Sequence, residues 1–400
     1  MNKRRKLLAG IVVFGIAMAL LFTSCSLFGD MDELRLKVAE KNDGDEPGAD
    51  DVYDPGDGSV GNPFKVSNAA ELAKVGSGTD GWTLDAHYIQ TAKITLTDNS
   101  WVPIGTLKNP FTGIYNGNGK TINLGAQANS DNGILITEED WEESGTDGDP
   151  IKLFGLFGMI MNGAKVKNLK LTGSITADPS YNSMAGSVAS CNWGGEIYNI
   201  SSKVNITCGY GGMAGGIVGV LTDGAVYNCY SSAIITAYYG ARPAFTGGIV
   251  GYTNDSDTGF NCNVEKCYAE GRIKTGGDRC YAGGIVGANS MNTGVIMYCA
   301  ALHTGIDADA GAEWGRIVGL DDSTSGGTLH NYANSGMVTL SPVTTNDPDD
   351  ENGADVNLVT YQNETWWTAT TDWGDVWGGE TEAKPWKWNG TAKRPILWFE

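Results

Sequence analysis

The chain has 400 residues, a formal net charge of −20 and only 18% charged residues. A chain this acidic is a poor partner for nucleic acid, because that affinity rests on Lys and Arg side chains that neutralise phosphates. Its 57 glycines are about twice the usual share, which favours β-structure with many tight corners and little helix.

The first 24 residues have the pattern of a secretory signal peptide. A basic start, Lys3 to Lys6, precedes an apolar run from Leu7 to Leu21. The small residues before Cys25 resemble a bacterial lipobox, although Phe22 stands where Leu is usual. We therefore predict a lipoprotein signal peptide at 1–24 and lipidation of Cys25, which anchors the protein in a membrane. An ordinary signal peptide and an uncleaved anchor are the alternatives, and the apolar run is short for a span.

Residues 25–60 are predicted to form the lipidated cysteine and an acidic, flexible tether. Removal of residues 1–24 takes away four basic residues and shifts the net charge from −20 to −24. Asp30 to Asp57 then carries eleven acidic and three basic residues, a composition typical of an extended linker. The body that follows is expected to be extracytoplasmic, at the outer membrane or cell surface.

Residues 61–150 are predicted to form an N-terminal cap, a first coil and an acidic loop. Ser67 is a candidate N-cap for a short helix that ends at Gly76. Strands are expected at 87–90 and 94–96, and the Asn-Gly-Asn-Gly run at 116–119 predicts a tight turn with positive φ. The acidic residues after 126 indicate a loop that leaves the core.

The next part of the chain repeats itself. Gly-Gly-Ile-Val-Gly occurs at 215–219, 247–251 and 283–287, with weaker copies before and after. The second residues of the six copies are 32, 29, 32, 36 and 32 residues apart, and they are Gly155, Ser187, Gly216, Gly248, Gly284 and Arg316. A near-constant period of this length is typical of a solenoid, in which one repeat cannot bury its apolar face alone.

Each period contains two further apolar segments. One reads Val226-Tyr227-Asn228-Cys229 and the other Ile235-Thr236 in the third copy. Three strands and three turns in about 30 residues correspond to one coil of a parallel β-helix, with strands about 4.8 Å apart along the axis. We therefore predict an all-β fold, a parallel β-helix of about six coils over residues 151–340.

The Gly-Gly-Ile-Val-Gly copies, with Asn228-Cys229-Tyr230 and Lys266-Cys267-Tyr268, resemble the GLUG repeat of bacterial surface proteins. The resemblance covers roughly residues 60–340. It implies a β-helical architecture and a cell-surface setting, and it carries over no catalytic residue.

Residues 341–400 are predicted to form a Trp-rich C-terminal cap. Seven tryptophans fall within 33 residues, from Trp366 to Trp398. Solenoids need an atypical terminal unit over the last apolar coil, and large aromatic side chains suit that task. The alternative is that these rings form a binding surface.

The cysteines after Cys25 are expected to be structural. Cys229, Cys267 and Cys299 occupy equivalent positions, so they should stack as buried thiols, since neighbouring rungs are too far apart for an unstrained disulfide. The remaining four lie near turns, where pairing stays open: Cys191, Cys208, Cys262 and Cys280.

Catalytic motifs are missing from the sequence. With three histidines and no His-Glu-x-x-His, Gly-x-Ser-x-Gly or phosphate loop, we expect no enzyme activity, metal or cofactor. The alternative is a polysaccharide-processing β-helix that uses turn carboxylates. Its candidates are Asp223, Asp255, Asp257, Asp321 and Asp322.

The sequence thus predicts a surface lipoprotein whose β-helix acts as an adhesion or binding module for a glycan, host protein or matrix protein. A structural spacer of the envelope is the second class. Tyrosines recur near equivalent corners, and we expect these five to contact a ligand: Tyr210, Tyr238, Tyr239, Tyr252 and Tyr281.

Overall fold

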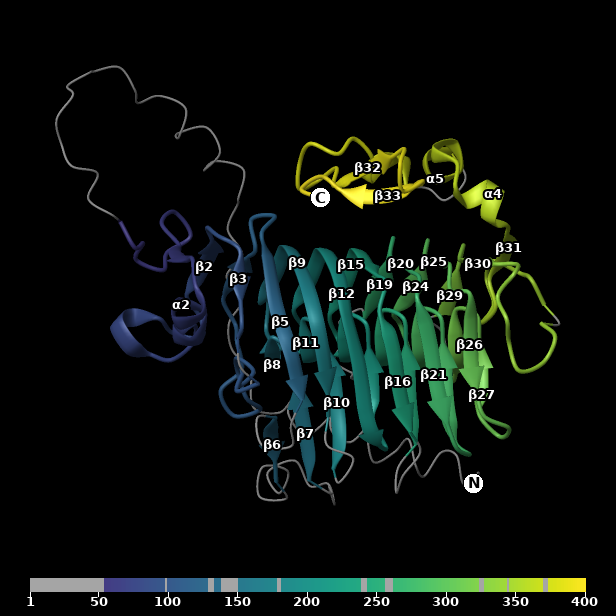
Figure 1. Ribbon diagram of the computed structural model, residues 1–400, viewed down its shortest axis with the longest axis horizontal. Helices are drawn as coiled ribbons and strands as arrows, with labels where there is room; N and C mark the ends of the chain where they lie inside the picture. The colour runs from purple at the N-terminus through teal and green to yellow at the C-terminus, as the bar shows by residue number, and fades with distance from the viewer. Residues whose placement is uncertain are drawn as a thin grey trace.

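The computed structural model describes residues 54–97, 99–128, 133–137, 150–177, 181–238, 243–255, 262–323, 327–343, 345–369 and 373–400. The signal peptide, Cys25 and most of the predicted tether and acidic loop lie outside these residues. The described chain is a parallel β-solenoid of about six turns, which confirms the predicted fold class (Figure 1). No helix in the described ranges has both the length and the apolar character to cross a membrane.

Three sheets form the walls of the solenoid. The seven-stranded sheet contains β6 (Ile134–Ile136), β7 (Ile151–Phe154), β10 (Asn182–Gly186), β13 (Met213–Gly215), β17 (Ala244–Gly247), β22 (Cys280–Gly283) and β27 (Glu313–Gly315). The six-stranded sheet contains β8 (Phe157–Met161), β11 (Ala189–Trp193), β14 (Val218–Thr222), β18 (Val250–Asn254), β23 (Val286–Ser290) and β28 (Val318–Asp321). Within both sheets the strands are parallel except for β6, which pairs antiparallel with β7.

The 18-stranded sheet, called the long sheet below, consists of two rows. The first row contains β1 (Phe64–Val66), β2 (His87–Gln90), β4 (Ile114–Asn116), β9 (Lys165–Thr176), β12 (Glu196–Tyr210), β15 (Ala225–Ser231), β19 (Asn263–Glu265), β20 (Tyr268–Ala269), β24 (Val295–Met297), β25 (Ala300–Ala301), β29 (Gly327–Leu329), β30 (Tyr332–Asn334) and β31 (Ala354–Val356). The second contains β3 (Ile94–Thr95), β5 (Thr121–Ala128), β16 (Ile234–Tyr238), β21 (Arg272–Gly276) and β26 (Gly305–Ala308). β9 and β12 run through both rows without a break.

The predicted period is confirmed by the strand register. Gly215, Gly247, Gly283 and Gly315 are direct partners in four successive coils. The motif Gly-Gly-Ile-Val-Gly forms a corner that is followed by a strand. β13 ends at Gly215, the chain bends at Gly216 and Ile217, and β14 begins at Val218. The motif therefore spans the corner between the seven-stranded and six-stranded sheets.

Glycine is required at this corner because carbonyl groups approach it closely. A Cβ on Gly247 would lie 1.9 Å from the oxygen of Val250, and one on Gly248 would lie 2.0 Å from the oxygen of Gly284 in the next coil. Both distances are far below van der Waals contact. The weaker copies carry an alternative: Ser187 donates a hydrogen bond of 2.6 Å to the oxygen of Gly216.

The same corner folds the outer faces of the two sheets toward each other. Met213 and Phe245 of the seven-stranded sheet belong to one buried cluster with Val220 and Tyr252 of the six-stranded sheet, separate from the cluster inside the solenoid. Outward-pointing side chains on this side are therefore buried. Tyr252 is 0% exposed, which corrects the expectation that it lies on a surface turn.

A second corner lies within the first row of the long sheet. One residue of each coil there has φ between 50 and 55°, in the left-handed region that Asn tolerates best among residues with side chains. These residues, called the left-handed corner below, are Asn168, Asn199, Asn228, Lys266, Tyr298 and His330.

The cysteine after this corner points into the solenoid. Cys229, Cys267 and Cys299 are fully buried thiols, and each Sγ lies 3.7–3.8 Å from a carbonyl oxygen of the preceding coil. Burial raises the pKa of the Cys267 and Cys299 thiols well above its usual value. The other four, whose pairing was left open, are also buried thiols: Cys191, Cys208, Cys262 and Cys280.

The N-terminal end of the solenoid carries α2 (Ala69–Lys74; Figure 1). Leu72 of this helix is buried in the core. The N-cap is Asn68 rather than the expected Ser67, since the Asn68 side chain accepts from the Glu71 amide. Residues 54–60 of the predicted tether are part of this end: Pro55 accepts from the amide of Lys65 and Gly58 from that of His87.

The Trp-rich segment is not a cap on the last coil. It contains α4 (Leu358–Tyr361), α5 (Glu364–Ala369), the 3-10 turn η2 (Gly374–Val376) and the antiparallel pair β32 (Trp386–Asn389) and β33 (Arg394–Leu397). Residues 358–400, called the arm below, run back along the outside of the long sheet (Figure 1). The last coil is instead covered by residues 345–356, where Glu351 accepts from the amides of Ile317 and Val318.

Aromatic packing holds the arm on the sheet. Trp367, Trp373 and Trp386 are fully buried against Tyr230 and Tyr268, which point outward from the long sheet. Arg394 pairs with Glu270 at 2.6 Å, and Tyr268 donates to the oxygen of Pro395 at 2.6 Å.

We predict that Gly248→Ala lowers the free energy of unfolding by about 2–3 kcal/mol, because the new Cβ collides with a carbonyl of the next coil. Urea unfolding measures the loss. The matched control is Gly61→Ala, where a Cβ meets nothing within 4 Å and the change should stay within about 0.5 kcal/mol. Equal effects of the two substitutions would contradict the role of the corner.

We also predict that Cys229, Cys267 and Cys299 stay unmodified by thiol reagents in the native protein and react once it is unfolded. Their burial removes both access and thiolate character. Non-reducing mass mapping is the check, and a peptide that links Cys229 to Cys267 would show that the stacked-thiol arrangement is wrong.

Candidate functional site

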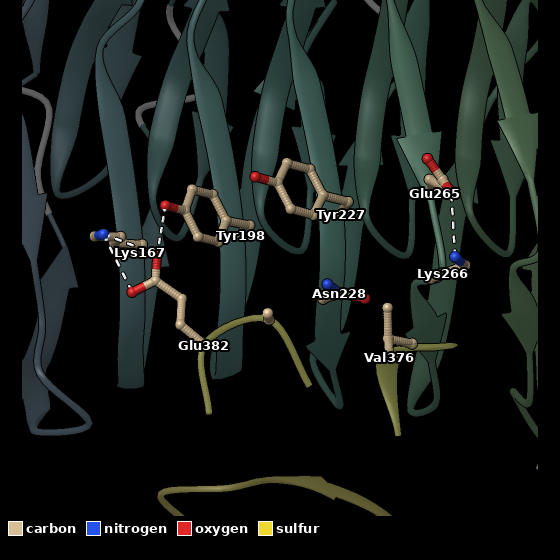
Figure 2. A pocket seen from close by; sticks show the side chains of 9 residues that line it. Lys167, Tyr198, Tyr227, Asn228, Glu265, Lys266, Val376 and Glu382 are labelled. Atoms are coloured by element: carbon tan, nitrogen blue, oxygen red, sulfur yellow. Dashed lines mark hydrogen bonds and ion pairs between the residues drawn. The ribbon is translucent and has the colours of Figure 1, made fainter. Parts of the chain in front are cut away.

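A groove of about 600 Å³ lies between the arm and the outer face of the long sheet. Figure 2 shows its lining: strands β9, β12, β15 and β19 supply one side, and the arm segment from Val376 to Ala383 supplies the other. Its residues are Lys167, Tyr198, Tyr227, Asn228, Glu265, Lys266, Val376, Glu382 and Ala383.

The aromatic part of the groove comes from two successive rungs. Tyr198 and Tyr227 are paired residues of β12 and β15, and each follows an inward Ile or Val, so strand alternation points both rings outward. Their rings stack with centroids 4.8 Å apart and planes 6° apart. Tyr198 is buried beneath its neighbours, whereas Tyr227 is partly exposed to the groove.

Glu382 of the arm closes one end of the groove. Its carboxylate accepts hydrogen bonds from Lys167 at 2.8 Å and from Tyr198 at 2.9 Å, and also from Asn168 at 3.0 Å. Burial alone would raise the pKa of Glu382, but these hydrogen bonds outweigh it and hold that pKa below its usual value. The arm is therefore fixed to two coils of the solenoid by one ionised group.

Lys266 forms the opposite end. Its Nζ lies 2.8 Å from Asp375 of the arm and 3.5 Å from Glu265, the last residue of β19. Between the two ends, Asn228 is bonded to the arm through its Oδ1, which accepts from the Trp386 indole at 3.3 Å.

The charges of the groove are balanced. Lys167 and Lys266 each have a carboxylate partner, and the Tyr198 and Tyr227 hydroxyls donate to Glu382 and Glu196. Burial, reinforced by these carboxylates, raises the pKa of both tyrosines above its usual value, so neither serves as a base at neutral pH. The arrangement offers an aromatic surface, amides and satisfied ion pairs, which suits binding.

The predicted ligand-contact tyrosines do not form one surface. Tyr238 is 45% exposed at the end of β16. Tyr281 is partly exposed on the seven-stranded sheet and stacks on Phe245 at 5.3 Å. Tyr252 lies inside the cluster described above, and burial raises its pKa to about 12. Tyr239 and the side chain of Tyr210 lie outside the described residues.

The carboxylates that the sequence suggested for an enzyme site mostly accept hydrogen bonds within turns or between neighbouring coils. Asp255 is buried and accepts from the amides of Asn292 and Thr293 at 2.7 Å, and Asp321 accepts from Asn289 at 3.0 Å. Asp322 is exposed, Asp223 takes a positive φ, and Asp257 lies outside the described residues. Among the residues described, no group of three His, Cys, Asp or Glu side chains is placed to hold a metal.

The structure thus selects Tyr198, Tyr227 and Asn228, which the sequence had marked only as part of the repeat. A usable signal was present: both tyrosines occupy the outward position between an inward aliphatic residue and the corner Asn. The arm residue Glu382 had no such signal. Its segment is polar and acidic, and nothing in that composition indicates which coil of the solenoid Glu382 contacts.

We predict that Glu382→Gln loosens the arm at neutral pH, by about 1 kcal/mol at most because the group is partly exposed. Since the folded-state pKa of Glu382 is lowered, the stabilisation is present above its usual value of 4.5 and is lost as pH falls through the lowered pKa. Hydrogen exchange of residues 358–400 should therefore show a gap between the wild type and the variant that closes in acid.

The exposed Glu380 gives the control for this experiment, because Glu380→Gln changes the same charge two residues away. Its exchange should match the wild type at every pH. A gap for Glu382→Gln that persists unchanged in acid would mean that the charge of Glu382 does not hold the arm.

Comparison with known proteins gives the fold and a distant relative. A scan of protein-family models finds no match, so the GLUG likeness remains a resemblance. A protein of Evansella cellulosilytica named "Putative Gly-rich membrane protein" is 30% identical over 160 residues, which are 38% of this chain and 16% of that protein. A crystal structure described as a "putative immunoglobulin A1 protease" from Bacteroides ovatus superposes with a TM-score of 0.60 over 86% of this chain and 95% of the other, at 19% identity. At that identity the likeness shows the β-helical fold alone.

Proposed function

We propose that this protein is a surface-anchored lipoprotein whose β-helix binds a ligand without catalysing a reaction, and that the groove beneath the arm is the binding site. The observation that carries the proposal is the groove itself: a concave, aromatic and amide-lined surface whose charged groups already have partners. Such a surface binds well and lacks an unpaired group poised for proton transfer.

The rigidity of the groove supports this role. Its sheet side is a set of strands hydrogen-bonded to neighbouring coils on both sides, and its arm side is fixed by buried Trp386 and Trp373. A preformed site loses little conformational freedom when a ligand enters, so more of the contact energy appears as affinity.

The surface location rests on the N-terminal sequence, with Cys25 after an apolar run, and agrees with the membrane-protein name of the distant relative. The name of the Bacteroides ovatus protein raises protease activity as an alternative. This chain has no His-Glu-x-x-His sequence, which favours binding over metal-dependent proteolysis.

The groove can be tested by filling it. Ala383→Trp places a large ring in the lining, and Ala392→Trp makes the same change at an exposed turn of the arm. On arrays of glycans and matrix proteins we expect a ligand whose affinity falls at least about tenfold with Ala383→Trp and is kept by Ala392→Trp. The proposal would be overturned if the arrays show no ligand, or if neither substitution changes the affinity for the ligand that they show.

Anchoring gives a separate prediction. Cys25→Ser should abolish incorporation of labelled fatty acid and release the protein from the membrane fraction, because the thiol is the acylated group. Ser26→Ala is the matched control and should leave both unchanged. Retention of the label in Cys25→Ser would show that the lipoprotein assignment is wrong.

A further inference from the structure

We propose that the groove takes a neutral saccharide, with a sugar hydroxyl bound at a break in an asparagine ladder and the sugar ring against Tyr227. This inference rests on the proposed binding function and names the chemical class of the ligand. It is carried by the left-handed corner, whose residues change their hydrogen bonding where the groove begins.

The ladder runs through three coils. Asn168 donates through Nδ2 to Oδ1 of Asn116 at 3.2 Å, and Asn199 donates in the same way to Oδ1 of Asn168 at 3.0 Å. The pattern would continue if Asn228 donated to Asn199. It stops there, because Asn199 Oδ1 is fully buried and has no hydrogen-bond partner in the described part of the chain.

The orientation of Asn228 is fixed by the arm. An indole N–H can only donate, so the atom that Trp386 Nε1 contacts at 3.3 Å must be the amide oxygen. The Nδ2 group of Asn228 is thereby on the other side, and it makes no hydrogen bond to the residues that the structure describes. Figure 2 shows this nitrogen on the side of Tyr198 and Glu382.

The break therefore places one donor, Asn228 Nδ2, in the lining of the groove, whereas the acceptor Asn199 Oδ1 is buried and Asn199 is not part of that lining. A hydroxyl group both donates and accepts, whereas an ammonium only donates and a carboxylate only accepts. A hydroxyl oxygen can accept from Asn228 Nδ2 without bringing a charge into the groove, whereas an ammonium has no acceptor to offer this donor.

Charge excludes most other ligands. A carboxylate or sulfate would face Glu265 and Glu382, and a cation would compete with Lys167 and Lys266 for their partners. Either would have to break an existing ion pair. A neutral polyol needs only hydrogen bonds and contact with the ring of Tyr227, whose hydroxyl is already bonded to Glu196.

A peptide strand is also a poor fit. Strand addition requires a sheet edge with unpaired amides and carbonyls, and β15 is paired with β12 on one side and with β19 and β20 on the other. The groove thus offers side chains and no backbone edge, which favours a carbohydrate over an extended polypeptide.

The test is a single-atom change at the break. Asn228→Asp keeps a residue that tolerates the left-handed conformation and keeps an acceptor for Trp386, but it removes the donor and adds a negative charge. Asn162→Asp is the matched control, because Asn162 also has positive φ and is exposed at another corner. Tyr227→Phe, which keeps the ring, is compared with Tyr227→Ala.

The full chain is titrated calorimetrically with neutral gluco-, xylo- and manno-oligosaccharides and with sulfated and uronic-acid oligosaccharides. We expect binding of at least one neutral series, weakened at least about tenfold by Asn228→Asp and Tyr227→Ala and kept within about threefold by Asn162→Asp and Tyr227→Phe. Thermal unfolding of each variant separates lost binding from lost structure.

Three results would overturn the inference. If only acidic oligosaccharides or proteins bind, and Ala383→Trp blocks them, the proposed function stands and the neutral saccharide is wrong. If neutral sugars bind but Asn228→Asp leaves their affinity unchanged, the ladder break is not the site. If no ligand loses affinity on Ala383→Trp, the groove is not a binding site, and both the proposed function and the saccharide inference are wrong.

Discussion

The geometry of the solenoid depends on the close approach of carbonyl oxygens to the glycines at the corner of successive coils, where an added Cβ would collide with them. Gly247 lies so close to Val250, and Gly248 so close to the next coil, that no side chain fits at either position. Because the same contact recurs in successive coils, each coil repeats the register of the one before it. The stacked tyrosines and the stacked thiols both follow from that register, since each pair occupies the same position in neighbouring coils.

This constraint also explains how much the sequence could predict. A position that accepts only glycine leaves a mark that is readable without coordinates, so the period, the fold class and the position of the Cys229 ladder were accessible. The direction in which the chain bends at the corner could not be predicted from the sequence. The corner bends the outer faces of two sheets together, and a residue such as Tyr252, which strand alternation places outside, is buried there by Phe245 of the neighbouring sheet.

The arm marks a second limit of sequence reasoning. The tryptophans of the arm indicated that this segment would be buried. Their partners could not be predicted, because the outward side chains Tyr230 and Tyr268 look like ordinary surface residues of the repeat. A terminal cap needs to match only the apolar end of a coil, whereas this segment matches a particular sequence of outward residues along several coils. Such a match involves pairs over a hundred residues apart, such as Tyr268 with Pro395, and no local pattern encodes it.

The groove arises where the repeat stops being regular. The left-handed corner carries Asn in three coils and then Lys266, Tyr298 and His330, so the arm meets a different side chain at each rung. It is bonded to the early rungs through Glu382 and to the later ones through Asp375 and Trp373, and between these contacts it spans the rung of Tyr227 and Asn228. A perfectly repetitive solenoid would carry the amide ladder through without a gap. Here the ladder stops between two asparagines, because Trp386 of the arm bonds to the amide oxygen of Asn228, and the amide nitrogen of Asn228 is left in the lining of the groove.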